Sequence, residues 1–213
     1  MPAAAQDIAT QFWPEIDTFV KLSDDSRLYV PLSKTREGVE DSDLDGTVGV
    51  YFDYYAVPIG KAWFLGLADS ARSQRLLLRG GYGYTAGGDG SPPTNTITGE
   101  FTGRQPLPWE ILASLRNRFD LNFTGDDFDP RYRVRLKLER NVSIGKPSLT
   151  PYVYGEFFYS FDQGDWIKER FTAGCELHLW KRVVPEVYFQ RDFTGDANQD
   201  TRGFGLVWSI YLR

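Results

Sequence analysis

From Arg131 to Glu139 the chain alternates a charged residue with an apolar or aromatic residue at every step. Successive side chains of a β-strand point to opposite faces of the sheet, so this segment predicts a strand with one charged face and one apolar face. The same period of two recurs through most of the chain. A soluble barrel would turn its apolar face inward, whereas an outer-membrane barrel turns charges toward its lumen and apolar side chains toward lipid. We favour the second arrangement.

The length of the chain, 213 residues, suits one all-β barrel, and no stretch resembles a linker between domains. We expect residues 1–5 to be the remnant of a secretory signal or a short disordered leader, and residues 6–213 to form the barrel domain. The mean hydropathy is −0.39, and no apolar run approaches the roughly 20 residues that a membrane helix needs. Strands of a membrane barrel are half polar, so this value is compatible with one.

Charge and cysteine content narrow the function further. The formal net charge of −5 argues against nucleic acid as a partner. The single cysteine, Cys175, permits no internal disulfide, and its neighbours in the alternation are apolar, so we interpret it as a packing residue. No pattern in the chain calls for a cofactor.

Segments with strand periodicity are separated by turn chemistry throughout the chain, and no helix-period segment competes with them. The sequence therefore predicts an antiparallel up-and-down transmembrane β-barrel of about twelve strands, or ten if the segments before Ser73 are miscounted. The predicted strands are 12–21, 27–35, 47–57, a weaker one at 61–68, 75–85, 95–105, 109–123, 131–142, 150–161, 167–180, 183–193 and 202–212.

The sequence predicts that connections in the later part of the chain alternate in length, with long or acidic ones at 87–93, 124–130, 162–165 and 194–200 and tight ones between them. Outer-membrane barrels have long extracellular loops and short periplasmic turns. Counted back from the C-terminus, this pattern predicts an even strand number with Arg213 at the periplasmic rim.

The polar faces of the central strands carry many charges of both signs. Like charges at cross-strand distance repel, so the arginines need carboxylates or anions nearby. The result is either a set of neutralised ladders that closes the lumen or a pore that selects solutes by charge. The residues expected to line the lumen are Arg116, Arg118, Arg133, Arg135, Lys137, Arg170, Glu110, Asp120, Glu139, Glu156, Glu176 and Glu186.

Aromatic residues stand near several predicted strand ends, among them Trp109, Trp166 and Trp180. Tryptophan and tyrosine favour the boundary between acyl chains and water, so we expect two aromatic girdles around the barrel.

Signals for metal binding and catalysis are sparse. Asp41, Asp43 and Asp45 match the opening of a calcium loop, but Phe52 stands where the loop's bidentate Glu is expected, so an acidic turn without metal is the favoured interpretation. The only histidine, His178, lacks a recognisable nucleophile motif, and we expect it to make a hydrogen bond in the lumen. We therefore predict no catalytic residues.

Several of these segments together resemble a family of bacterial outer-membrane β-barrels of unknown function. They are Phe12-Trp13-Pro14-Glu15, Arg116-Asn117-Arg118, the strand from Arg131 to Arg140, the segment from Pro151 to Glu156 and the segment from Gly203 to Leu206. The resemblance implies a Gram-negative outer-membrane barrel. It supplies no substrate and no catalytic residue.

The sequence thus predicts a monomeric barrel in the bacterial outer membrane, in contact with its lipid, that is either a narrow porin-like channel for small anionic solutes or a structural barrel. Two rivals remain open. One is a soluble, lipocalin-like barrel that binds a ligand on its apolar face, and the other is an outer-membrane enzyme.

Overall fold

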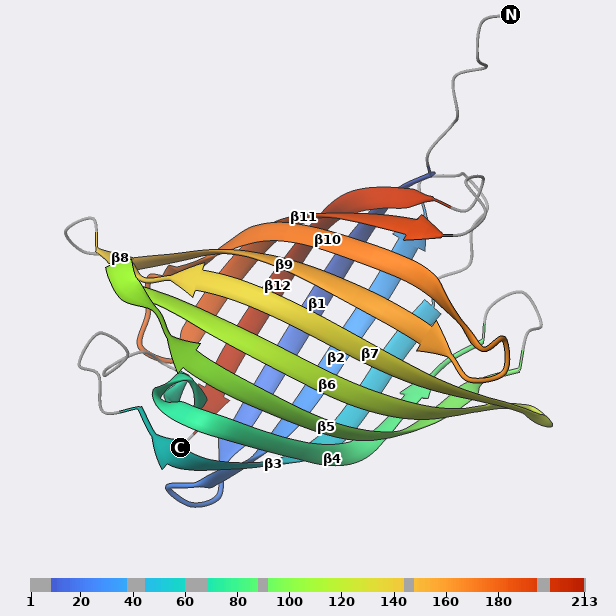
Figure 1. The fold of residues 1–213 in the computed structure, drawn as a ribbon, viewed down its shortest axis with the longest axis horizontal. Helices are drawn as coiled ribbons and strands as arrows, with labels where there is room; N and C mark the ends of the chain where they lie inside the picture. The colour runs from blue at the N-terminus through green and yellow to red at the C-terminus, as the bar shows by residue number, and fades with distance from the viewer. Residues whose placement is uncertain are drawn as a thin grey trace, which may run out of the picture.

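The computed structural model describes residues 9–37, 45–59, 69–87, 92–143, 148–194 and 200–212, which form a closed β-barrel (Figure 1). Its elements are the strands β1 (Ala9–Lys21), β2 (Ser26–Glu37), β3 (Asp45–Pro58), β4 (Gln74–Thr85), β5 (Thr94–Pro106), β6 (Ile111–Thr124), β7 (Asp127–Arg140), β8 (Val142–Ser143), β9 (Ser148–Ser160), β10 (Asp165–His178), β11 (Val183–Thr194) and β12 (Thr201–Leu212) and the 3-10 turns η2 (Ser70–Ser73) and η3 (Pro108–Glu110). Within these ranges no helix is long and apolar enough to cross a membrane.

The predicted all-β, up-and-down barrel of about twelve strands is confirmed. Eleven strands form the wall, and the two-residue strand β8 pairs beside β9. The weaker strand predicted at 61–68 and the leader at 1–5 lie outside the described residues.

The barrel closes at a parallel seam. Neighbouring wall strands are antiparallel except β1 and β12, which run side by side in the same direction from Ala9 opposite Thr201 to Val20 opposite Leu212. Eleven strands in up-and-down order require this, because an odd count makes the first and last strands point the same way. The predicted even count is therefore wrong for the wall, and it also departs from the even numbers usual in bacterial outer-membrane barrels. We call the end where β1 starts the N-terminal end and the end where β12 stops the C-terminal end.

Connection lengths do not distinguish the two ends. At the N-terminal end, β6 and β7 are joined by only Gly125 and Asp126, whereas at the C-terminal end residues 59–73 connect β3 to β4. The predicted loop at 124–130 is mostly strand, because β7 pairs with β6 as far as Asp127 opposite Thr124. Gly125 has a φ of 59°, which a glycine adopts without steric cost and which allows so tight a turn.

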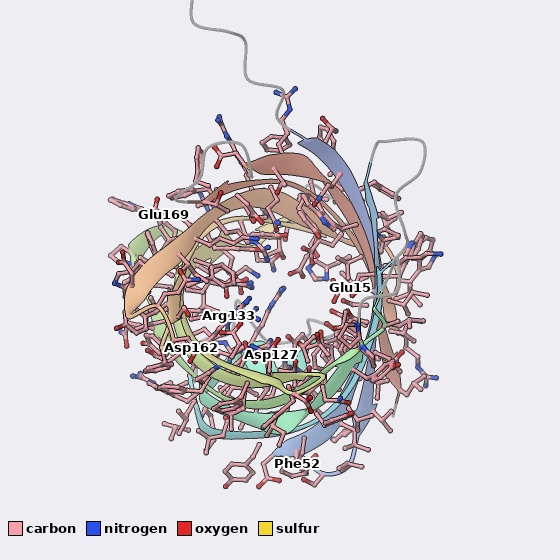
Figure 2. All side chains as sticks on the ribbon, turned by 90° about the vertical axis from the view of Figure 1, so that its right-hand side faces the viewer. Glu15, Phe52, Asp127, Arg133, Asp162 and Glu169 are labelled. Atoms are coloured by element: carbon pink, nitrogen blue, oxygen red, sulfur yellow. The ribbon has the colours of Figure 1, made fainter. Side chains whose placement is uncertain are left out.

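The two faces of the wall differ sharply in chemistry. Large apolar side chains lie outside: Leu136 is 54% exposed, Phe119 51% and Phe52 47%. Charged side chains lie inside, where Asp120 and Glu156 are both 0% exposed. Figure 2 shows this contrast, with Phe52 outside the wall and Arg133 reaching into the lumen. Water-soluble proteins bury apolar side chains and expose charges, and this wall does the reverse.

The seam depends on a glycine at a close approach of two strands. A Cβ atom at Gly203 of β12 would stand 2.0 Å from the carbonyl oxygen of Gln11 on β1, so only a residue without a side chain fits there without moving the backbone.

We therefore expect Gly203→Ala to lower the free energy of unfolding by about 1–3 kcal/mol, the usual cost of overpacking. Denaturant titration of the refolded barrel in detergent measures this. Gly99→Ala is the matched control, since a Cβ there meets no atom within 4 Å. Equal losses in the two variants would contradict the packing argument.

Candidate functional site

The lumen holds a cavity of about 430 Å³, and its wall includes all six cations predicted to line the barrel. They come from three strands: β6, β7 and β10. Those residues are Arg116, Arg118, Arg133, Arg135, Lys137 and Arg170. A second cavity, of about 200 Å³, lies toward the C-terminal end and shares part of this lining.

These cations form ion pairs with carboxylates that are buried in the wall, and each of these carboxylates pairs with two cations. Asp120 contacts Arg118 Nε and Arg133 Nε at 2.8 Å each. Glu156 contacts Arg116 Nη2 at 2.5 Å and Arg135 Nη2 at 2.7 Å. Because one negative charge is shared by two positive ones, this part of the wall keeps a surplus of positive charge.

The pattern continues on β10 and β11. Asp192 contacts Arg170 Nε at 2.9 Å and Lys168 Nζ at 2.5 Å. One further carboxylate, Glu100 on β5, lies 3.6 Å from Arg116 Nη1. It reduces the surplus of positive charge on this wall but does not cancel it. Sharing of this kind cannot be predicted from one strand, since apart from Arg118 and Asp120 the partners lie on different strands.

The opposite wall carries acidic and tyrosine side chains. Glu15 and Asp17 on β1 and Glu186 on β11 line the 430 Å³ cavity, and none has a Lys or Arg nitrogen within 4 Å in the described part of the chain. Tyr29 donates a hydrogen bond to Asp17 Oδ1 at 2.9 Å, and the hydroxyl of Tyr152 donates one to Glu186. The lumen therefore has a basic side and an acidic side.

At the C-terminal end, residues 69–73 turn into the barrel and cross-link its walls, and we call them the inward segment. Asp69 Oδ1 accepts a hydrogen bond from Arg27 Nη1 at 2.7 Å, and Arg104 Nη1 donates to the carbonyl oxygen of Ala71 at 3.0 Å. Burial raises the pKa of Asp69, but the guanidinium groups of Arg27, Arg72 and Arg104 outweigh burial and hold that pKa well below its ordinary value. Asp69 therefore stays ionised.

Arg72 of the inward segment spans the lumen to two other strands. Its Nε lies 3.4 Å from Glu139 Oε1 on β7, and its Nη2 donates to Glu176 on β10. Lys137 Nζ also contacts Glu139, at 2.6 Å, and Glu176, at 3.7 Å. Ala71 of the segment is fully buried and packs with Tyr55 and Leu77. The inward segment thus narrows the C-terminal end of the lumen.

One predicted lining residue is placed elsewhere. Glu110 belongs to turn η3, has a φ of 59° and is exposed, so the prediction that it lines the lumen is wrong. The strand predicted to start at Trp109 starts at Ile111, and the residues before it leave the alternation.

Several charged residues of the lumen were not predicted, among them Arg27, Arg79, Glu100 and Arg104 and the four discussed next. Glu15 and Asp17 flank Ile16 in the alternation of β1, so their spacing was a usable signal. Asp69 and Arg72 lie in a connection without periodicity, and nothing in the sequence places their side chains inside the barrel.

The described residues that were considered for catalysis or metal binding make ordinary contacts in the structure. His178 Nε2 lies 2.8 Å from Thr150 Oγ1, and the Cys175 thiol contacts the carbonyl oxygen of Glu176 at 3.6 Å. Asp45 opens β3 opposite Thr35, while Asp41 and Asp43 lie outside the described residues. Within the described ranges no group of three or more His, Cys, Asp or Glu side chains could hold a metal ion.

The fold and its lumen define a closed β-barrel with a charged interior and an apolar exterior. The chain belongs to a family described as "Protein of unknown function (DUF2490)", whose model matches residues 59–202. A search of curated proteins finds no match. The matched range includes the whole basic side of the lumen but not Glu15 or Asp17. The predicted resemblance to a barrel family of unknown function is thereby confirmed; the outer-membrane location that it implied remains a proposal.

Proposed function

We propose that this protein is an outer-membrane β-barrel whose lumen forms a narrow, porin-like passage with a preference for anions. The observation that carries the proposal is the inversion of the wall, with apolar side chains outside and ion pairs inside. Such a surface has no favourable contact with water but suits acyl chains. A lipocalin-like role would place the apolar side chains around the cavity, which is instead lined by charges.

Aromatic side chains at both ends of the barrel support this proposal. Trp109 and Trp180, which are 80% and 55% exposed, lie in turns at the C-terminal end. Trp166 and Phe161, each 50% exposed, lie at the N-terminal end. Exposed aromatics at two levels are typical of the girdles at the two membrane interfaces.

The anion preference follows from the shared carboxylates. Low-dielectric walls focus the field of the surplus cations into the lumen, and this concentrates anions there although the whole chain is acidic. The inward segment narrows the lumen, so the expected conductance is small.

Planar-bilayer recording tests the proposal. We expect refolded protein to give a small conductance whose reversal potential in a salt gradient indicates anion preference. Arg133→Glu combined with Arg135→Glu should weaken or reverse this preference, because it exchanges two lining cations for two anions. Glu169→Gln, on the exposed side of β10, is the control and should leave the preference unchanged.

Two results would count against the passage. Absence of current from correctly folded protein would indicate a structural barrel closed by its ion pairs. Cation preference in the wild type would refute the lining that we propose.

A further inference from the structure

We propose that the 430 Å³ cavity binds a small zwitterionic solute, with the carboxylate of the solute on the basic side of the lumen and its ammonium group on the acidic side. This inference names the solute class of the proposed passage and rests on it. The volume is within the range of ligand pockets and has room for on the order of a dozen non-hydrogen atoms, given about 30 Å³ per water molecule.

On the basic side, arginines that line the cavity outnumber the carboxylates that pair with them. Arg116 and Arg135 share Glu156, and each uses its Nη2 atom for that contact. Arg118 and Arg133 likewise share Asp120. A guanidinium group has five N–H donors and binds carboxylates with charge-assisted hydrogen bonds, so arginines that share one carboxylate can accommodate one more anion.

The acidic side has few cations: among the residues that line the cavity there, Arg79 on β4 is the cation near Asp17. Glu15, Asp17 and Glu186 line the cavity with no Lys or Arg nitrogen within 4 Å among the described residues. Asp17 accepts a hydrogen bond from Tyr29, Glu186 accepts one from Tyr152, and Glu15 and Asp17 are hydrogen-bonded to each other. Burial without a close cation makes such carboxyl groups costly to ionise, and an ammonium group of a bound solute would stabilise their ionised form.

The fold places the two sides opposite each other. In the ring of wall strands, β6 and β7 lie across the lumen from β1. Figure 2 shows the same arrangement, with Glu15 and Arg133 on opposite sides of the lumen. A separation of charge across a cavity favours a solute that carries both charges, because a simple anion or a simple cation satisfies only one side.

Calorimetric titration of the refolded full-length barrel in detergent micelles tests the proposal with three solutes of one size. Glycylglycine carries both charges, N-acetylglycine lacks the ammonium group, and glycylglycinamide lacks the carboxylate. We expect glycylglycine to bind at least about tenfold more tightly than either, since each lost charge pair is worth about that factor. Equal affinities for glycylglycine and N-acetylglycine would reduce the site to a simple anion site and overturn the proposal.

Variants locate the two sides. Glu15→Gln with Glu186→Gln should remove the advantage of glycylglycine over N-acetylglycine, and the matched control Glu169→Gln should keep it. If the double variant fails to refold, the comparison of the three solutes on the wild type still decides. Binding of glycylglycine without any ion current would overturn the passage and retain the site, whereas current without preference for glycylglycine would overturn the site alone.

Discussion

Replacing Leu136 with arginine should lower the free energy of unfolding of the lipid- or micelle-embedded barrel by about 2–4 kcal/mol, the cost of a basic side chain at the bilayer midplane. Leu136 lies on the outer face of β7, where it is 54% exposed and paired with Leu115 and Gly155 in the middle of the neighbouring strands. Denaturant titration in phospholipid vesicles measures the loss.

The control for this prediction is a substitution by arginine at a position outside the wall. Trp109→Arg introduces the same charge at a turn beyond the wall, and we expect a cost of about 0–1 kcal/mol, as for a site at the interface. If both substitutions were neutral, and the wild type folded in buffer without lipid or detergent, the outer face would be facing water. The membrane location would then be wrong, and a soluble barrel would take its place.

The alternation of charged and apolar residues carried most of the correct prediction. In β7 it separated Arg133 and Arg135 from Leu136 on opposite faces, and the structure places the first two in the lumen and the third outside. The period of two is a local property of a strand, so it can be read from one segment. It also gave the limits of most strands, because turn residues interrupt it.

Features that depend on how the barrel closes could not be predicted from the alternation within single strands. The parallel seam follows from an odd strand number, and that number depends on whether the residues between β3 and β4 add a strand to the wall. The described part of that connection, 69–73, lies inside the barrel. The contacts of Arg72 with Glu139 and Glu176 join residues 67 and 104 positions apart, so no local sequence pattern predicts them. The prediction for Glu110 was wrong for a local reason. A turn with positive φ ends the alternation before Ile111, so Glu110 is not part of the strand in which it was predicted.

The inward segment leads to the second large expected effect. Arg72→Met removes the cation that holds this segment against β7 and β10, and it leaves Glu139 and Glu176, both under 10% exposed, with Lys137 as their shared basic contact. Breaking a buried ion pair from one side costs about 3–5 kcal/mol, and we expect the lower part of that range because Lys137 compensates in part. Denaturant titration in micelles measures this loss of stability.

The triple variant Arg72→Met, Glu139→Gln, Glu176→Gln separates charge from packing. Removing these three charges together should recover part of the lost stability, because neither carboxylate is then left without its partner, although Lys137 loses both of its carboxylate contacts. Both variants should conduct more than the wild type in planar bilayers, since neither keeps the ion pairs of Arg72 that fix the inward segment to β7 and β10. A triple variant that is stable again but conducts no better than the wild type would show that the inward segment is not the constriction, and the narrowest part of the passage would then lie at the paired arginines of β6 and β7.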